Sequence, residues 1–129
     1  MNPDAPCPCG TDMPFASCCS PFIEGTGIPE TAEALMRSRY AAYALGRADY
    51  LISTWHPTTR RQGVDLDEEV KWIGLKIVRT QDGGPNDKEG MVEFVARYKV
   101  GGRAHRMREV SRFVRRDGRW FYVSGEEVI

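Results

Sequence analysis

The spacing of hydrophobic residues changes about halfway along the chain. Between residues 32 and 45, apolar and aromatic side chains recur at helical spacing, which predicts an amphipathic helix. Thr31 is a residue type that caps helix N-termini, and Gly46 is a common stop after the last turn. A second, shorter helix is predicted from Ala48 to Trp55, because Pro57 disfavours its continuation.

The second half of the chain alternates between apolar and polar residues with a period of two, which is typical of strands with one buried face. This pattern predicts four strands, over residues 71–80, 92–100, 103–115 and 119–123. Turn-forming sequences separate them, at residues 82–87, Gly101-Gly102 and Asp117-Gly118. Helices followed by a meander of strands predict an α+β domain, with helices packed on a curved, mainly antiparallel sheet.

Composition limits the classes of protein to which the chain can belong. Its 129 residues suffice for one domain with a short appendage. Lys and Arg together number 18, as do Asp and Glu, so overall charge gives no reason to expect binding to nucleic acid or anionic lipid. Without a secretory signal at residues 1–6 or an apolar run near the roughly 20 residues of a membrane span, we expect a cytoplasmic protein with no membrane contact.

Four cysteines provide the strongest chemical signal. Cys7, Cys9, Cys18 and Cys19 lie within a short N-terminal stretch, and no other cysteine follows. Four thiolates at this spacing suit one tetrahedral Zn²⁺ ion, with bonds of about 2.3 Å and no position left for a substrate. We therefore predict a single structural zinc with the four cysteines as its ligands, so that His56 and the other histidine are not needed as ligands. Local disulfides, reduced thiols and a redox role are the alternatives.

Two sets of sequence segments resemble known families. Cys7-Pro-Cys-Gly followed by Cys18-Cys19-Ser-Pro resembles the SEC-C motif, a small zinc hook, although Thr11-Asp12 stands where that family usually has Ser-Gly. Further segments resemble the YchJ family of bacterial proteins, namely Leu35–Tyr40, Asp49–Leu51, Thr54–Pro57, Ser111–Phe113 and Gly118–Tyr122. This resemblance implies a domain similar to nuclear transport factor 2 and to cystatins, a cone of curved sheet and helices. We accordingly predict a cysteine hook (residues 1–23), a linker (24–30) and a cone domain (31–129).

The strand at 103–115 supplies the first candidate for chemistry in the cone. Glu109 shares one face of this strand with Met107 and Phe113, so we expect it to point inward, where a carboxylate needs a partner such as Arg37, Arg39, His56 or a tyrosine hydroxyl. If Glu109 and His56 faced one cavity, they could act as an acid/base pair in a small isomerase, dehydratase or hydrolase. That enzyme is the less favoured alternative. Its candidate pocket residues are Tyr40, Tyr43, Trp55, Phe94, Ser111 and Trp120.

The opposite face of the same strand is basic. It holds Arg106, Arg108 and Arg112, and Arg116 continues the row. A solvated outer face is the default interpretation, and contact with RNA, a ribosomal surface or an acidic protein is the alternative. Because aromatic residues are not interleaved there, we do not expect sequence-specific reading of bases. The favoured hypothesis is a zinc-binding adaptor, monomeric or homodimeric, whose cysteine hook contacts a protein and whose cone packs behind it or binds a small ligand.

Overall fold

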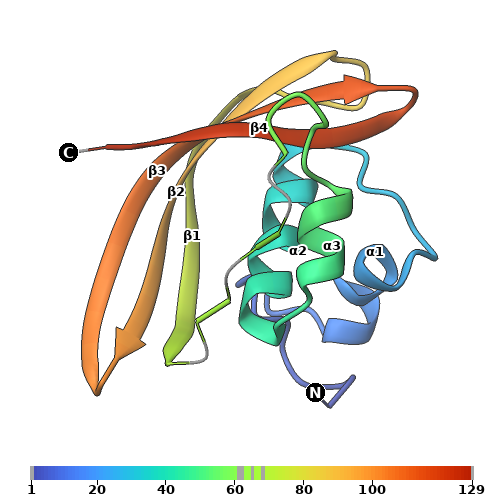
Figure 1. Ribbon diagram of the computed structural model, residues 1–129. Coiled ribbons are helices and arrows are strands. Elements are labelled where there is room, and N and C mark those ends of the chain that lie inside the picture. The colour runs from blue at the N-terminus through green and yellow to red at the C-terminus, as the bar shows by residue number, and fades with distance from the viewer. Residues whose placement is uncertain (1, 61–62, 65, 68, 129) are drawn as a thin grey trace.

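The computed structural model describes residues 2–60, 63, 64, 66, 67 and 69–128 of the chain. Residue 1 of the predicted cysteine hook and residue 129 of the predicted cone domain therefore lie outside the described residues. A few short helices pack on a four-stranded, curved antiparallel sheet, which confirms the predicted fold class (Figure 1). In chain order the elements are η1 (Phe15–Ser17), α1 (Ser20–Glu24), α2 (Ala32–Leu45), α3 (Ala48–Ser53), β1 (Val70–Asp82), β2 (Glu89–Val100), β3 (Arg103–Arg116) and β4 (Arg119–Glu127).

The long helix α2 begins and ends where its flanking residues predict. The Thr31 side chain accepts a hydrogen bond from the Ala34 N–H at 3.0 Å, and Gly46 closes the helix in the left-handed conformation. The following helix α3 ends at Ser53, earlier than the predicted Trp55. The Thr54 hydroxyl at this end donates back to the Tyr50 carbonyl at 2.7 Å, which satisfies one of the free carbonyls there.

The strands are joined by hairpins in the order β1-β2-β3-β4. Register shifts interrupt β1 between Trp72 and Gly74 and the β3–β4 pair between Arg112 and Phe113, and irregularities of this kind bend and twist a sheet. The sheet therefore curves around α2 and α3, with β4 crossing one end of the helices (Figure 1). Strand β4 continues beyond the predicted residue 123, because residues 124–127 keep pairing with β3 although none of them is hydrophobic.

One core lies between the helices and the concave face of the sheet. Its fully buried side chains include Leu35 and Leu51 from the helices and Val92 and Phe113 from the strands. Three cysteines of the cysteine hook belong to the same buried cluster. The hook therefore packs as part of the molecule's core, not as a separate appendage.

The hairpin turns differ in how tightly they are held. At the β1–β2 turn, a Cβ on Gly83 would lie 2.8 Å from the Ala32 Cβ, and the Ala32 N–H donates to the Gly83 carbonyl at 2.9 Å. This contact pins the turn to the start of α2. At the β2–β3 turn, by contrast, neither Gly101 nor Gly102 has an atom within 4 Å of where a Cβ would be.

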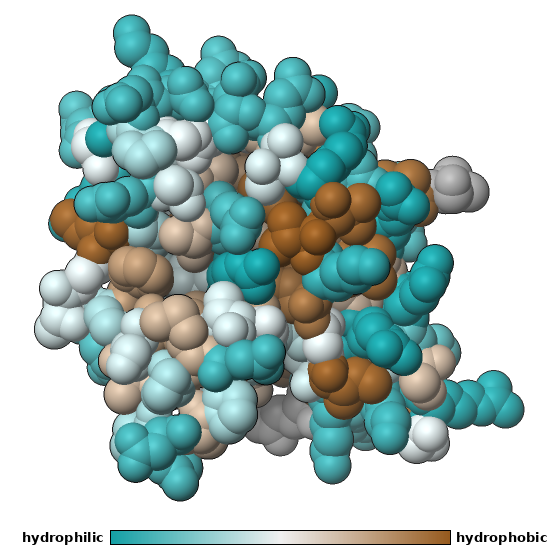
Figure 2. All heavy atoms as spheres, turned by 180° about the vertical axis from the view of Figure 1, so that it is seen from behind, coloured by the Kyte–Doolittle hydropathy of each residue, from teal (hydrophilic) through white to brown (hydrophobic). Residues whose placement is uncertain are grey.

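The far side of the molecule has a mixed surface. Hydrophobic residues gather near the middle of this view, with hydrophilic residues around them (Figure 2). The exposed large hydrophobic residues include Ile73 and Val78, both on β1. Within the described part of the chain, no helix is both long enough and apolar enough to cross a bilayer.

Candidate metal centre and inner cavity

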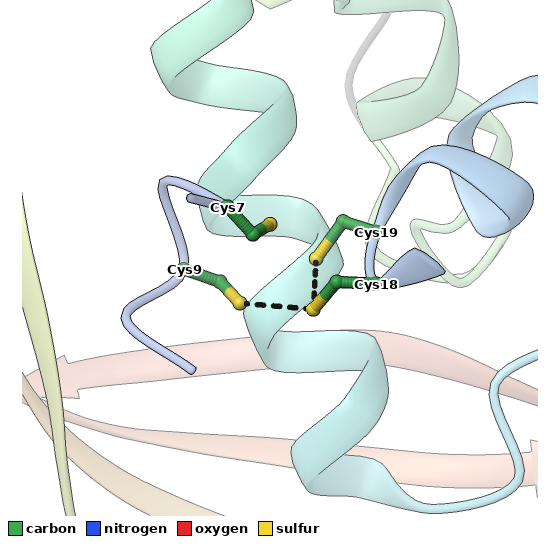
Figure 3. Close-up of side chains that lie close together, drawn as sticks. All are labelled: Cys7, Cys9, Cys18 and Cys19. Atoms are coloured by element: carbon green, nitrogen blue, oxygen red, sulfur yellow. Dashed lines mark hydrogen bonds between the residues drawn. The ribbon is translucent and has the colours of Figure 1, made fainter. Parts of the chain in front are cut away.

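The cysteine hook is a small antiparallel loop followed by two helical turns. The Cys7 N–H donates to the Met13 carbonyl at 2.8 Å, and the Phe15 N–H donates to the Ala5 carbonyl at 2.9 Å. Cys18 and Cys19 follow η1 and directly precede α1, so they return toward the loop that holds Cys7 and Cys9. The four side chains point toward one another beside α2 (Figure 3).

The sulfur atoms of these cysteines have the spacing of a metal site. The Sγ of Cys18 lies 3.5 Å from that of Cys9 and 3.9 Å from that of Cys19, and all four Sγ atoms lie within 4.8 Å of one another. A tetrahedron with metal–sulfur bonds of about 2.3 Å has edges of roughly 3.8 Å, so the donor set fits a zinc ion. All four cysteines are free of disulfides.

Burial and mutual contact separate the pKa values of these thiols. Hydrogen bonds with Cys19 and Cys7 lower the pKa of Cys9, whereas hydrogen bonds with Cys7 and Cys9, together with burial, raise the pKa of Cys19. For Cys7, the contact with Cys19 lowers the pKa, but Cys9 and burial outweigh it and raise the pKa to about 11. Thiolates this close repel one another, so a bound cation is needed before all four can be ionised.

The residues between the cysteine pairs support the sulfurs. Thr11 Oγ1 lies 3.1 Å from the Cys18 Sγ and 3.6 Å from the Cys9 Sγ, which are hydrogen-bond distances for sulfur. Asp12 has a φ of 65°, in the left-handed region that favours glycine and tolerates aspartate. Thr11-Asp12 thus supplies the hydroxyl and the left-handed backbone expected of Ser-Gly in the SEC-C pattern.

Besides the shared buried cluster, the cysteine hook contacts the cone domain through Arg37 and Gly10. Arg37, on α2, donates from Nη1 to the Cys9 carbonyl at 2.7 Å, and its Nε pairs with Glu33 at 3.1 Å. Gly10 lies so close to β1 that a Cβ there would be 2.9 Å from the Leu75 carbonyl oxygen. The position of the cysteines therefore depends on α2 and β1 as well as on the loop itself.

A second candidate site is a cavity of about 260 Å³ between α2 and the concave face of the sheet. Four of the predicted pocket residues line it, namely Tyr40, Tyr43, Phe94 and Ser111. The other two do not. Trp55 packs edge-on against Tyr122, and Trp120 is buried elsewhere, with its indole N–H donating to the Glu30 carbonyl at 3.0 Å.

The structure does not bring Glu109 and His56 to one cavity. Glu109 lines the inner cavity, where burial raises its pKa, the neighbouring Ser111 opposes this rise and the Glu127 carboxylate adds to it. His56 lies outside the cavity lining. Its Nδ1 is 2.7 Å from the Thr58 hydroxyl, and its backbone N–H donates to the Tyr122 carbonyl. The geometry required for the predicted acid/base pair is thus missing, because Pro57 and the exit from α3 turn His56 toward β4.

Arg39 also lines the cavity, although the sequence suggested it only as a possible partner for Glu109 and not as a pocket residue. Its side chain is 4% exposed, donates to the Leu51 carbonyl at 2.8 Å and to the Thr54 hydroxyl at 2.6 Å, and lies over the Tyr122 ring. A signal was present, because Arg39 falls within the helical stripe of Met36, Tyr40 and Tyr43. The other lining residues that were missed are Met36, Trp72, Ala96, Met107 and Tyr122.

The four arginines of the predicted basic face are exposed on β3. Arg108 and Arg79 both pair with the buried Glu93, whose pKa they lower. Arg116 lies 3.9 Å from Asp117, whereas Arg106 and Arg112 form no ion pair among the described residues. Part of the basic charge is thus neutralised within the sheet, and contact with RNA or the ribosome stays a prediction.

Comparisons with known proteins agree with this architecture. A family model described as the YchJ middle NTF2-like domain matches residues 31–125. UPF0225 proteins from Chromobacterium violaceum and Streptomyces coelicolor are 58% and 49% identical to the chain, over 94% and 96% of it and 92% and 97% of their own lengths. The solution structure of a SEC-C motif containing protein from Rhodopseudomonas palustris matches with a TM-score of 0.84 and 37% identity, covering 95% of this chain and 98% of that one. A crystal structure of another SEC-C motif containing protein, from Psychrobacter arcticus, matches with a TM-score of 0.77 and 25% identity, covering 95% of this chain and 82% of that one.

Proposed function

We propose that this chain, which belongs to the YchJ family, binds one structural zinc ion through Cys7, Cys9, Cys18 and Cys19. The observation that supports this most is the convergence of four disulfide-free sulfurs within 4.8 Å of one another. Four thiolate ligands complete a tetrahedral shell, which leaves no position for a substrate. The ion would therefore fix the cysteine hook in place, without taking part in a reaction.

The elemental composition of the purified protein tests this proposal. Protein isolated under reducing conditions should contain about one zinc per chain, and X-ray absorption should give a shell of sulfur neighbours at about 2.3 Å. Cys18→Ser should lower the zinc content, and Ser17→Ala, next to it in the chain and exposed, is the matched control. Another metal in the same sulfur shell would contradict the choice of zinc but not the four-cysteine site. A metal-free protein would overturn the site.

We also infer that the metal-bound hook contacts a protein partner in the cytoplasm. Met13, at the exposed end of its loop, has 47% of its surface accessible, and exposed Asp12 and Pro14 flank it. A photo-crosslinking residue at position 13 should give a discrete protein adduct in cells, which Cys18→Ser abolishes. The same residue at Val128, which is 39% exposed, is the control. Equal adducts at both positions would argue against a contact specific to the hook.

A further inference from the structure

The inner cavity has aromatic walls. Tyr40 and Tyr43 of α2 and Trp72 of β1 form one side, where the Trp72 ring contacts both tyrosines at centroid distances of 5.8 and 6.0 Å. Phe94 and Tyr122 contribute further ring surface. Rings favour offset or edge-on contact with other rings, so the walls suit a flat ligand. The volume of about 260 Å³ lies below the usual range of drug-sized sites, which limits that ligand to about a single substituted ring.

Three polar side chains face this apolar space. Arg39 lies on α2, and Glu109 and Ser111 lie on β3. Ser111 is 1% exposed, and its Oγ is the one buried side-chain polar atom among the described residues without a partner of good hydrogen-bond geometry, although it lies close enough to the Glu109 carboxylate to lower that group's pKa. Arg39 and Glu109 line the same cavity but form no ion pair within the described structure. Arg39 already donates from Nη1 to the Leu51 carbonyl and the Thr54 hydroxyl, and Ser111 interacts with Glu109. Buried polar groups are normally fully paired, so the remaining N–H groups of Arg39 and the carboxylate oxygens of Glu109 have capacity for a further partner.

We propose that the cavity binds a small, flat, uncharged organic molecule with an acceptor for Arg39 and a donor for Glu109, such as a primary aromatic amide. An uncharged ligand fits because the lining already holds one cation and one carboxylate. A charged ligand would leave one of them without compensation in a largely apolar space. An amide group offers a carbonyl and an N–H together, and the Ser111 hydroxyl can bond to either. This site is separate from the metal centre and does not depend on the proposed zinc.

Four single-ring probes of similar size test the proposal: benzamide, benzoate, benzylammonium and toluene. Binding is followed at pH 7 by the methyl signals of Met36 and Met107, which line the cavity, with the exposed Met13 as internal control. Benzamide should bind at least about tenfold more tightly than toluene, because it alone satisfies the polar groups without adding a charge. The Met36 and Met107 signals should shift, and that of Met13 should not.

A variant of Glu109 separates polar recognition from simple filling of a hydrophobic space. Glu109→Met should weaken benzamide binding about tenfold and leave toluene binding unchanged. The matched control is Glu126→Met, an exposed glutamate on β4 that pairs with Val110. Equal binding of toluene and benzamide, tightest binding of either charged probe, or no effect of Glu109→Met would overturn the proposal. Absence of any shift at Met36 and Met107 would mean that water alone fills the cavity, which also overturns it.

Discussion

The cysteine hook and the cone domain are stabilised by different kinds of buried side chain. The hook has no regular element longer than the five residues of α1, and Cys7, Cys9 and Cys19 are its buried cysteines. The cone domain has strands of up to 14 residues, and its deepest side chains are large and apolar, such as Leu51 and Phe113. Sulfur atoms in the hook thus occupy the place that hydrocarbon side chains occupy in the cone.

This difference indicates what each region requires to stay folded. Burial of hydrocarbon surface stabilises the cone without any ligand, at about 25 cal/mol per Å² of apolar area. Packed thiols bury little such area, so the hook depends on its proposed metal. Because both regions belong to one buried cluster, a substitution in either one should also lower the stability of the other, but by a smaller amount.

Metal removal should have the largest effect, and it should fall mainly on the cysteine hook. Structural zinc contributes roughly 10–16 kcal/mol in zinc-finger peptides, which is more than a single side chain supplies. Hydrogen exchange after chelation should show loss of protection at the Cys7 and Phe15 amides, with protection retained along β2 and β3. Simultaneous exchange of both regions would show that they have no separate stability.

Truncation of Phe113 should have the next largest effect, and it should fall on the cone domain. The side chain is fully buried, so Phe113→Ala should lower the free energy of unfolding by about 3–5 kcal/mol. Urea denaturation measures this loss, and the exposed Val128→Ala is the control. Zinc content should be unchanged in the folded variant. A metal-depleted Phe113→Ala protein would mean that the cysteines cannot assemble without an intact cone core.

Arg37 tests the contact between the two regions. Arg37→Met keeps most of the side-chain stem but removes the hydrogen bond to the Cys9 carbonyl, so we expect a loss of about 1.5–3 kcal/mol. Arg47→Met is the matched control, because its partners Glu24 and Asp49 are largely exposed. Chemical denaturation of the metal-bound proteins compares the two variants. Equal stabilities would show that the Arg37 contact does not support the hook.

The pH dependence of stability gives the smallest predicted effect. The pKa of Glu93 is lowered by Arg79 and then by Arg108, so its contribution is present above its unfolded pKa and disappears as the pH falls through the folded value. Glu93→Gln should therefore flatten the loss of stability in acid, whereas Glu126→Gln on β4 should not. Denaturation at a series of pH values from 7 to 3 measures both. Acid also protonates thiolate ligands, so release of metal is followed in the same samples.

The sequence predicted those features that depend on local patterns. Thr31 and Gly46 bounded α2 correctly, because caps act within one helical turn. The continuation of β4 to Glu127 was missed, since Ser124-Gly125 has no alternating pattern and is held only by pairing with β3. The hypothesis that Glu109 and His56 face one cavity was wrong for a related reason. Whether two residues 53 positions apart share a cavity depends on the tertiary path of the chain, which no spacing encodes.

Arg39 shows a different limit of sequence analysis. A charged residue within an apolar helical stripe was visible, but sequence cannot show that its guanidinium would find the Leu51 carbonyl and the Thr54 hydroxyl at the end of α3. The cysteines are the opposite case. Their ligand chemistry constrains them so strongly that four residues and their spacing were enough to predict that the sulfurs converge.

The unequal hairpin turns determine where the chain can be engineered. The β1–β2 turn touches the first residue of α2 through Gly83, so an inserted segment there would push the helix away from the sheet. The β2–β3 turn at Gly101-Gly102 has open space around both residues. A fluorescent label, an affinity tag or new chain termini placed between these two glycines would leave both the cysteine hook and the inner cavity undisturbed.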